Sequence, residues 1–216
     1  MLSVLFDGID VAARKKILAE ARKKRVPASQ IVIRDGERAN RLFLLADGSI
    51  KFYRITPQGS EVLLWLLSAG DVFGLGTLLS RPAFYMGTAE TLRKCELYVW
   101  EHDGARRLGA AYPRLAENLL RIVLRYGSDH ADRLVGIVAE TAPQRVAHAL
   151  LGLAERAGAL ANDGLKIDVT NEHLSAMANV SPFTVSRVLN KWERSGAVTK
   201  TRGNVRIHVP EKLAME

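Results

Sequence analysis

The stretch Asn179–Ala197 reads NVSPFTVSRVLNKWERSGA and decides how the C-terminal part of the chain folds. Within it, Val185, Leu189 and Trp192 recur at the i, i+4, i+7 spacing, which predicts a helix with a narrow apolar stripe against a small core. The opposite face carries polar and basic side chains, namely Thr184, Arg187, Lys191 and Arg194. The stretch therefore predicts a helix that presents a basic face to solvent.

The residues before this helix specify a tight turn. Asn179 suits a left-handed backbone, because Asn tolerates positive φ better than most side chains do. Ser181 is a suitable N-cap, and Pro182 fits the first turn because the amide that it lacks would have no partner there. A shorter helix, TNEHLSAMA with Thr170 as its N-cap, comes before the turn. Two helices and a tight turn predict a helix-turn-helix, whose second helix is sized for the major groove of DNA.

A hairpin follows the second helix. The segment Ala197–Val209 reads AVTKTRGNVRIHV, two β-forming runs around the turn signal RGN. Val205, Ile207 and Val209 alternate with polar residues, so one face of the second run can pack inward while its basic face meets phosphate. Residues 139–216 are therefore predicted to form a winged helix-turn-helix domain.

The charge of the chain points to a polyanion. The net charge is +8 in 216 residues, and nucleic acid is the first partner to consider for such a protein. Residues 180–209 hold six Lys or Arg and one acidic residue, whereas residues 138–179 hold three basic and five acidic residues. The positive charge is thus concentrated on the predicted DNA-binding segment.

Composition and length exclude several classes of protein. No apolar run approaches the about 18 to 20 residues of a membrane-spanning helix, and the start MLSVLFDGID lacks an export signal, so a cytoplasmic protein without membrane contact is expected. Cys95 is the single cysteine, which excludes an internal disulfide and an iron–sulfur cluster held by this chain alone. No catalytic constellation, P-loop or metal-ligand motif occurs, so neither an enzyme nor a metal site is expected.

The N-terminal half reads as β-structure after a short basic helix. Arg14–Lys16 and Arg22–Arg25 are expected on one amphipathic helix, with Ile17 and Leu18 on its apolar side. From residue 31 to residue 100, short β-forming runs are separated by turn signals about every 8 to 12 residues, which is the spacing of an antiparallel barrel or sandwich. Residues 1–110 are therefore predicted to form an antiparallel β-roll.

A long helical pattern connects the two parts. The segment LAENLLRIVLRYGSDHADRLVGIVAE repeats apolar residues at three- and four-residue steps, at Leu115, Leu119, Ile122, Tyr126, Leu134 and Ile137. Such a stripe is typical of a coiled coil, so residues 111–138 are predicted to pair with a second copy through Leu119, Ile122 and Tyr126. Gly127, Asp129 and His130 interrupt the stripe, which leaves open a ligand-facing opening or a solvated irregularity.

Taken in order, these parts resemble the cyclic-AMP receptor/fumarate-nitrate regulator (CRP/FNR) family of bacterial transcription factors. The resemblance rests on RDGERANRLFLLADGSIKFY and AGDVFG in the roll, the long helix, and NVSPFTVSRVLNKWERSGAV with the wing. It implies an α+β fold with a cyclic-nucleotide-binding-like roll, or double-stranded β-helix. It also implies a homodimer on a two-fold symmetric double-stranded DNA site, an effector in each roll, and RNA polymerase as a partner if the protein is an activator.

The recognition helix departs from the family pattern. Pro182 and Phe183 stand where family members carry Arg-Glu, and only Arg187 matches a later arginine of that motif. Phe183 is suited to a thymine methyl group and Arg187 to the O6 and N7 atoms of guanine. The predicted base-reading residues are Ser181, Phe183, Thr184, Ser186, Arg187 and Asn190. The predicted phosphate contacts, which position the protein without reading sequence, are Lys191, Lys200, Arg202 and Arg206.

The predicted sensor departs as well. In cyclic-nucleotide binders of the family a Glu follows Phe-Gly and an Arg-Ser pair holds the phosphate, whereas here Leu75 follows Phe73-Gly74 and Tyr85-Met86 stand about where Arg-Ser would. The effector pocket is predicted at Phe73, Gly74, Leu75, Gly76, Tyr85 and Met86. No cofactor is evident and cyclic AMP is not expected, because the family's Glu and Arg are absent.

Other effectors and functions stay open at this point. The cysteine cluster of oxygen sensors is absent, the arginine of the 2-oxoglutarate-binding branch is replaced by Ala83, and no histidine spacing favours a haem ligand. The sequence therefore leaves the effector open, including the case that there is none. The alternative function is a small-molecule-binding module that acts through protein contacts, with the helix-turn-helix as a docking element.

Overall fold

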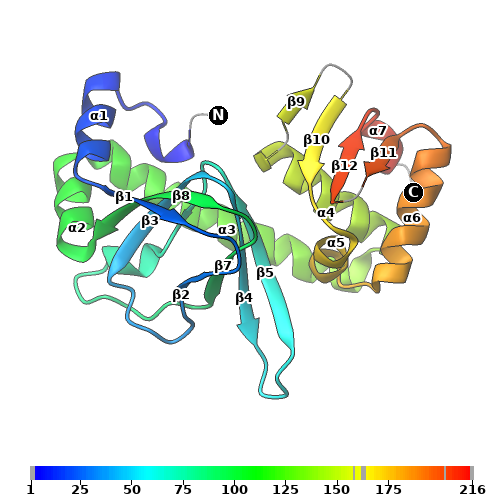
Figure 1. Ribbon diagram of the computed structural model, residues 1–216, viewed down its shortest axis with the longest axis horizontal. Coiled ribbons are helices and arrows are strands. Elements are labelled where there is room, and N and C mark those ends of the chain that lie inside the picture. The colour runs from blue at the N-terminus through cyan, green and yellow to red at the C-terminus, as the bar shows by residue number, and fades with distance from the viewer. Residues whose placement is uncertain (1–2, 158, 162–163, 202, 215–216) are drawn as a thin grey trace. The chain divides into compact units, whose positions relative to one another are not determined.

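The chain forms two units in a computed structural model that describes residues 3–157, 159–161, 164–201 and 203–214. They are Met1–Ser128, with the roll, and Asp129–Glu216, with the winged helix-turn-helix (Figure 1). The predicted α+β fold class is confirmed. The finer boundaries at residues 110 and 138 stay a prediction.

The roll of the first unit is built from antiparallel strands (Figure 1). Among the described residues they form two four-stranded sheets, ordered β1-β8-β3-β6 and β2-β7-β4-β5. The strands are β1 (Arg22–Val26), β2 (Ile31–Ile33), β3 (Arg41–Asp47), β4 (Ser49–Ile55), β5 (Glu61–Ser68), β6 (Val72–Phe73), β7 (Thr88–Thr91) and β8 (Cys95–Glu101). The predicted antiparallel β-roll is confirmed.

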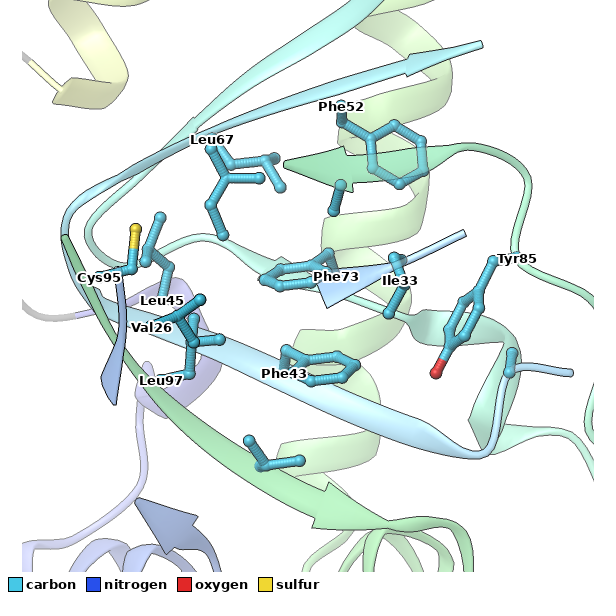
Figure 2. Packing of buried hydrophobic residues seen from close by; sticks show 14 residues of the cluster. Val26, Ile33, Phe43, Leu45, Phe52, Leu67, Phe73, Tyr85, Cys95 and Leu97 are labelled. Atoms are coloured by element: carbon cyan, nitrogen blue, oxygen red, sulfur yellow. The ribbon is translucent and has the colours of Figure 1, made fainter. Parts of the chain in front are cut away.

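Apolar side chains from both sheets fill the interior of the roll. Phe43 and Phe73 stack with ring centroids 4.7 Å apart and ring planes 6° from parallel. Figure 2 shows Val26, Leu45 and Leu97 beside this pair, with further members of the cluster around them. Stacked aromatic rings bury large areas at well-defined geometry, so this interior is a packed core.

The basic N-terminal segment is not one helix. Helix α1 (Val11–Ala19) follows the short 3₁₀ helix η1 (Val4–Phe6) and ends before the second basic cluster. Arg22–Arg25 lie in β1, which pairs with β8 from Arg22 opposite Val99 to Val26 opposite Cys95. The prediction of one amphipathic helix is therefore wrong for these four residues, because the ladder to β8 and burial of Val26 select a strand.

The long helix runs unbroken from Pro113 to Ala139. This helix, α3, follows α2 (His102–Ala111) and passes through Gly127, Asp129 and His130 without a break. The interruption in its apolar pattern is thus a change of side chains and does not open the backbone.

The first part of α3 packs against the roll. Leu119 and Ile122 are 2% and 1% exposed and belong to a core cluster with Leu44 and Trp100. The hydroxyl of Tyr126 donates to the carbonyl of Val72 at 3.0 Å. The prediction that Leu119 and Ile122 form the dimer interface is therefore wrong, because the roll of the same chain already covers both side chains; for the half-buried Tyr126 it stays a prediction.

A different face of α3 is apolar and exposed. Its exposed large side chains are Leu120, Val123, Leu124, Leu134, Val135, Ile137 and Val138. Leu120, Leu124, Gly127, Ala131, Leu134 and Val138 follow alternating steps of four and three residues, which is the heptad spacing of a coiled-coil seam. We call these six residues at heptad spacing the α3 seam.

The second unit joins helices to one small sheet. After the end of α3 come α4 (Ala142–Ala157), β9 (Ala159–Ala161), β10 (Gly164–Asp168), α5 (Asn171–Ala178), α6 (Pro182–Arg194), β11 (Val198–Thr201), β12 (Asn204–Ile207) and α7 (Glu211–Ala214). Among the described residues, the strands order as β11-β12-β10-β9 (Figure 1). Helices α5 and α6 with the β11–β12 hairpin confirm the predicted winged helix-turn-helix.

Candidate nucleic-acid interface

The turn between α5 and α6 has the predicted backbone. Asn179 has φ 50° and ψ 53°, the left-handed conformation. Thr170 caps α5 by accepting from the amide of His173 at 3.2 Å, and Ser181 caps α6 by accepting from the amide of Thr184 at 3.1 Å. These short contacts set the direction in which α6 leaves the turn.

Helix α6 has one buried and one exposed face. Val185, Leu189 and Trp192 are buried, as their spacing predicted, and Val188 joins them. The side chain of Phe183 is 76% exposed. The other predicted base-reading and phosphate-contacting residues of the helix are exposed or half-buried, namely Ser181, Thr184, Ser186, Arg187, Asn190 and Lys191. The structure thus brings these side chains to the open side of one helix.

The wing is joined to α6 by polar contacts. The backbone amide of Lys200 donates to Glu193 at 3.1 Å, and its ammonium group lies 3.8 Å from the same carboxylate. The ammonium group also donates to the side-chain oxygen of Asn190. A predicted phosphate contact and a predicted base-reading residue are therefore bonded to each other, which orients the amide of Asn190.

Two further predicted phosphate contacts belong to the wing. Arg206 is half-buried on β12, opposite Thr199 on β11 and Lys166 on β10. Next to it, the hydroxyl of Thr199 and the ring of His208 lie 2.8 Å apart. Arg202 lies outside the described residues.

The predicted effector residues occupy the wall of the roll's core. Phe73 is buried in the stack with Phe43, and Gly74 has φ 79°, where a Cβ atom would collide with the carbonyl oxygen of Arg41. The Tyr85 hydroxyl accepts from the amide of Arg41 at 3.2 Å and lies 3.3 Å from its carbonyl oxygen. Burial raises the pKa of this phenol, so it stays neutral. Leu75 and Gly76 are half-buried, and Met86 is 73% exposed.

None of these predicted effector side chains carries a positive charge. Phe73 and Tyr85 belong to one core cluster, whereas Met86 is turned to solvent. Arg41 carries the cation next to Tyr85, and its guanidinium already donates to Glu101 at 2.9 Å. Arg81 is exposed. The wall of the roll therefore offers an apolar surface where a cyclic phosphate would require a positive charge.

Comparison with known proteins agrees with both units. Residues 23–112 match the cyclic nucleotide-binding domain, and residues 144–216 match the Crp-like helix-turn-helix domain. The chain is 30% identical over 192 residues to the cAMP-activated global transcriptional regulator Vfr of Pseudomonas aeruginosa, covering 85% of this chain and 87% of Vfr. The chain belongs to the CRP/FNR family of transcription factors.

Other members of the CRP/FNR family are similar over nearly the whole length. The CRP-like cAMP-activated global transcriptional regulator of Mycobacterium tuberculosis is 27% identical over 212 residues, which are 97% of this chain and 94% of that protein. The solved structure of FixK2 from Bradyrhizobium japonicum is 18% identical and has a TM-score of 0.78, covering 89% of this chain and 95% of FixK2. The FixK2 likeness shows the shared fold.

The structure adds features of this CRP/FNR chain that sequence reasoning missed. The α3 seam could have been found from its heptad steps. Two apolar stripes lie side by side on α3, however, and the dimer interface was predicted on the stripe that faces the roll. Arg133 and Arg145 bond to the end of α5, a contact for which the sequence holds no local signal.

Within the part of the chain that the structure describes, no group of three or more His, Cys, Asp or Glu residues could hold a metal ion. No helix in that part is long and apolar enough to cross a membrane.

Proposed function

We propose that this CRP/FNR-family chain is a sequence-specific transcriptional regulator that binds a two-fold symmetric double-stranded DNA site as a homodimer. The observation that carries the proposal is the exposed polar and basic face of α6, held by a capped turn and flanked by the wing. Such a helix fits the major groove. The chain acts in this proposal as a regulator and not as an enzyme, in the cytoplasm where its DNA lies, and RNA polymerase is its partner if it activates.

The reading residues follow from the positions on α6. Phe183 is exposed at the start of the helix and offers an apolar surface to a thymine methyl group, while Arg187 lies one turn further on and can fork onto guanine. Ser181, Thr184, Ser186 and Asn190 flank this pair. Lys191, Lys200, Arg202 and Arg206 are proposed to contact phosphates, which fix the register on DNA.

The α3 seam is the proposed dimer interface. Leu120, Leu124 and Leu134 are more than half exposed, and leaving such side chains in water is unfavourable by about 25 cal/mol per Å² of apolar surface. A second copy of α3 would cover them by knobs-into-holes packing. The seam replaces Leu119 and Ile122 in this role.

The roll is proposed not to take cyclic AMP. Leu75 offers no carboxylate to the ribose, and Phe73 and Tyr85 fill the adjacent wall with neutral side chains. Either an effector of another chemistry then gates DNA binding, or the protein binds DNA without an effector. The relatives from Pseudomonas aeruginosa and Mycobacterium tuberculosis are, by contrast, named as cAMP-activated regulators.

Selection of duplexes from a random DNA pool tests the function. We expect enrichment of an inverted repeat with half-site centres about 34–36 Å apart, or one helical turn. Arg187→Ala should then lose about 1 to 3 kcal/mol of binding free energy and relax the choice at one base pair, whereas Lys191→Ala should weaken all sequences alike.

The salt dependence separates this function from its alternative. DNA binding through phosphates makes the logarithm of affinity fall linearly with the logarithm of salt concentration, by about 0.9 for each phosphate contacted. A folded, dimeric protein that enriches no sequence and binds DNA only weakly would favour the module that acts through protein contacts.

A further inference from the structure

We infer that Arg145 and Arg133 are positioning residues for DNA recognition, which hold the carbonyl end of α5 and so determine where α6 stands at the end of α3. The inference rests on the proposed function, because it concerns how the two recognition helices of a dimer are spaced. Both arginines lie in the second unit, outside the DNA-reading face.

Arg145 joins three helix ends. It lies in the first turn of α4, where its Nε atom donates to the carbonyl of Ala178 at 2.9 Å. A terminal nitrogen of the same guanidinium donates to the carbonyl of Glu140 at 2.7 Å. Ala178 is the last residue of α5, and Glu140 follows the last residue of α3. One planar group therefore links the end of α3, the start of α4 and the end of α5.

Arg133 makes the second link. It projects from the last part of α3, and its guanidinium donates to the carbonyl of Ala176 in the final turn of α5. Burial lowers the pKa of Arg133 from its ordinary value, because desolvation disfavours the cation. An arginine is nevertheless charged at neutral pH, so a partly buried cation faces the end of the helix.

The chemistry of a helix end explains why arginines suit this place. The last four carbonyl groups of a helix have no partner within the helix, and the helix dipole makes this end negative. The carbonyl of Ser175 accepts from the amides of Asn179 and Val180. The carbonyls of Ala176 and Ala178 accept from Arg133 and Arg145. The rigid fork of Arg145 holds two carbonyls in a fixed direction, which a lysine could not do.

The position of α5 determines that of α6. After Ala178 only the turn of Asn179, Val180 and Ser181 separates the two helices, and α5 packs directly against α6. In a dimer joined through α3, the distance between the two recognition helices then depends on how firmly each α5 is held at the end of its α3. The bases that α6 reads do not depend on this link.

The test is the choice of half-site spacing by the full-length protein. For the wild type, the affinity ratio between the selected site and the same site with one base pair inserted between its half-sites is measured. We expect Arg145→Gln and Arg133→Gln to lower this ratio by about threefold to thirtyfold, the range of couplings carried through packed networks, and to enrich several spacings. The bases enriched within each half-site should stay those of the wild type.

Matched variants separate positioning from simple helix capping. Arg106→Gln makes the same charge change at an exposed place in α2 and should leave the ratio unchanged. Arg187→Ala should lower both affinities equally. If Arg145→Gln does not fold, the same ratio is measured on Arg133→Gln and on Arg145→Lys.

Two outcomes would count against the inference in different ways. Variants that lose thermal stability but keep the single spacing of the wild type would make the arginines helix caps only and would overturn the inference alone. A folded wild type that enriches no paired site would overturn the proposed function together with it.

Discussion

Gly48 is a residue whose missing side chain lets two strands of the roll close. It connects β3 to β4 with φ 111°, a conformation that L side chains rarely adopt. A Cβ atom at this position would lie 2.8 Å from the Cα atom of Cys95 and 2.9 Å from the carbonyl oxygen of Lys94. Both neighbours belong to the backbone and cannot rotate away.

We predict that Gly48→Ala destabilises the roll far more than Gly59→Ala does. Gly59 also has positive φ, at 83°, but no atom lies within 4 Å of its would-be Cβ, so only the backbone strain of about 1 to 2 kcal/mol applies there. At Gly48 the steric conflict adds about 1 to 3 kcal/mol. Urea denaturation of both variants and the wild type measures the difference. Equal losses would mean that the contact with Cys95 is relieved without cost.

Asn190 illustrates how a residue's neighbours change its role. Alone, its amide can either donate to or accept from a base edge. The bond from Lys200 fixes which end of the amide is the oxygen and uses one of its two acceptor positions. If Asn190 reads a base as proposed, the wing orients the amide that does so.

At the scale of elements, α3 has two apolar faces, one packed against the roll and one exposed, which we propose meets a second copy. Leu119 and Ile122 lie in the core of the roll, while Leu120 and Leu124 are exposed. These four side chains alternate around a helix in which residues three and four apart share a face. A single apolar stripe would have served one of these purposes.

We predict that Leu124→Glu yields a folded monomer, because a charge in the seam opposes pairing with a second copy. Leu119→Ala should instead keep the dimer and lower the free energy of unfolding by about 2 to 5 kcal/mol, since it leaves a cavity in the core of the roll. Sedimentation at micromolar concentration and thermal melting distinguish the two effects. A Leu124→Glu protein that sediments as a dimer would place the interface elsewhere.

At the scale of the whole molecule, the local concentration of positive charge on residues 180–209 suits a DNA-binding protein. The chain carries a net charge of +8, and its second unit holds six Lys or Arg within residues 180–209. A basic surface raises the rate of encounter with DNA and releases counterions on binding. The roll, by contrast, presents neutral aromatic and aliphatic groups at the predicted effector positions.

We predict that cyclic AMP neither binds this protein nor changes its affinity for DNA. Arg41, the cation beside Tyr85, already donates to Glu101, and burial of an unpaired anion against Phe73 and Tyr85 would be strongly unfavourable. Isothermal titration with cyclic AMP should give no saturable heat, and DNA affinity should be the same with and without the nucleotide. Saturable binding that shifts the affinity for the selected site would contradict this reading of the roll.

Local signals in the sequence predicted the DNA-binding part closely. The cap at Ser181, the left-handed turn at Asn179 and the apolar stripe of α6 each depend on interactions within a few residues, and each is found in the structure. The glycine-punctuated strands of the roll could be predicted for the same reason. Neighbouring residues carry these preferences, so the sequence alone determines them.

Tertiary structure alone decided which partners the ambiguous segments take. Arg22–Arg25 became a strand because β8, more than seventy residues later, offers its ladder, and the roll rather than a second copy covers Leu119 and Ile122. The same holds for Arg145, whose two acceptors, Glu140 and Ala178, lie on either side of it in the sequence. The free energy of such contacts depends on groups brought together by folding, and no local pattern of residues contains it.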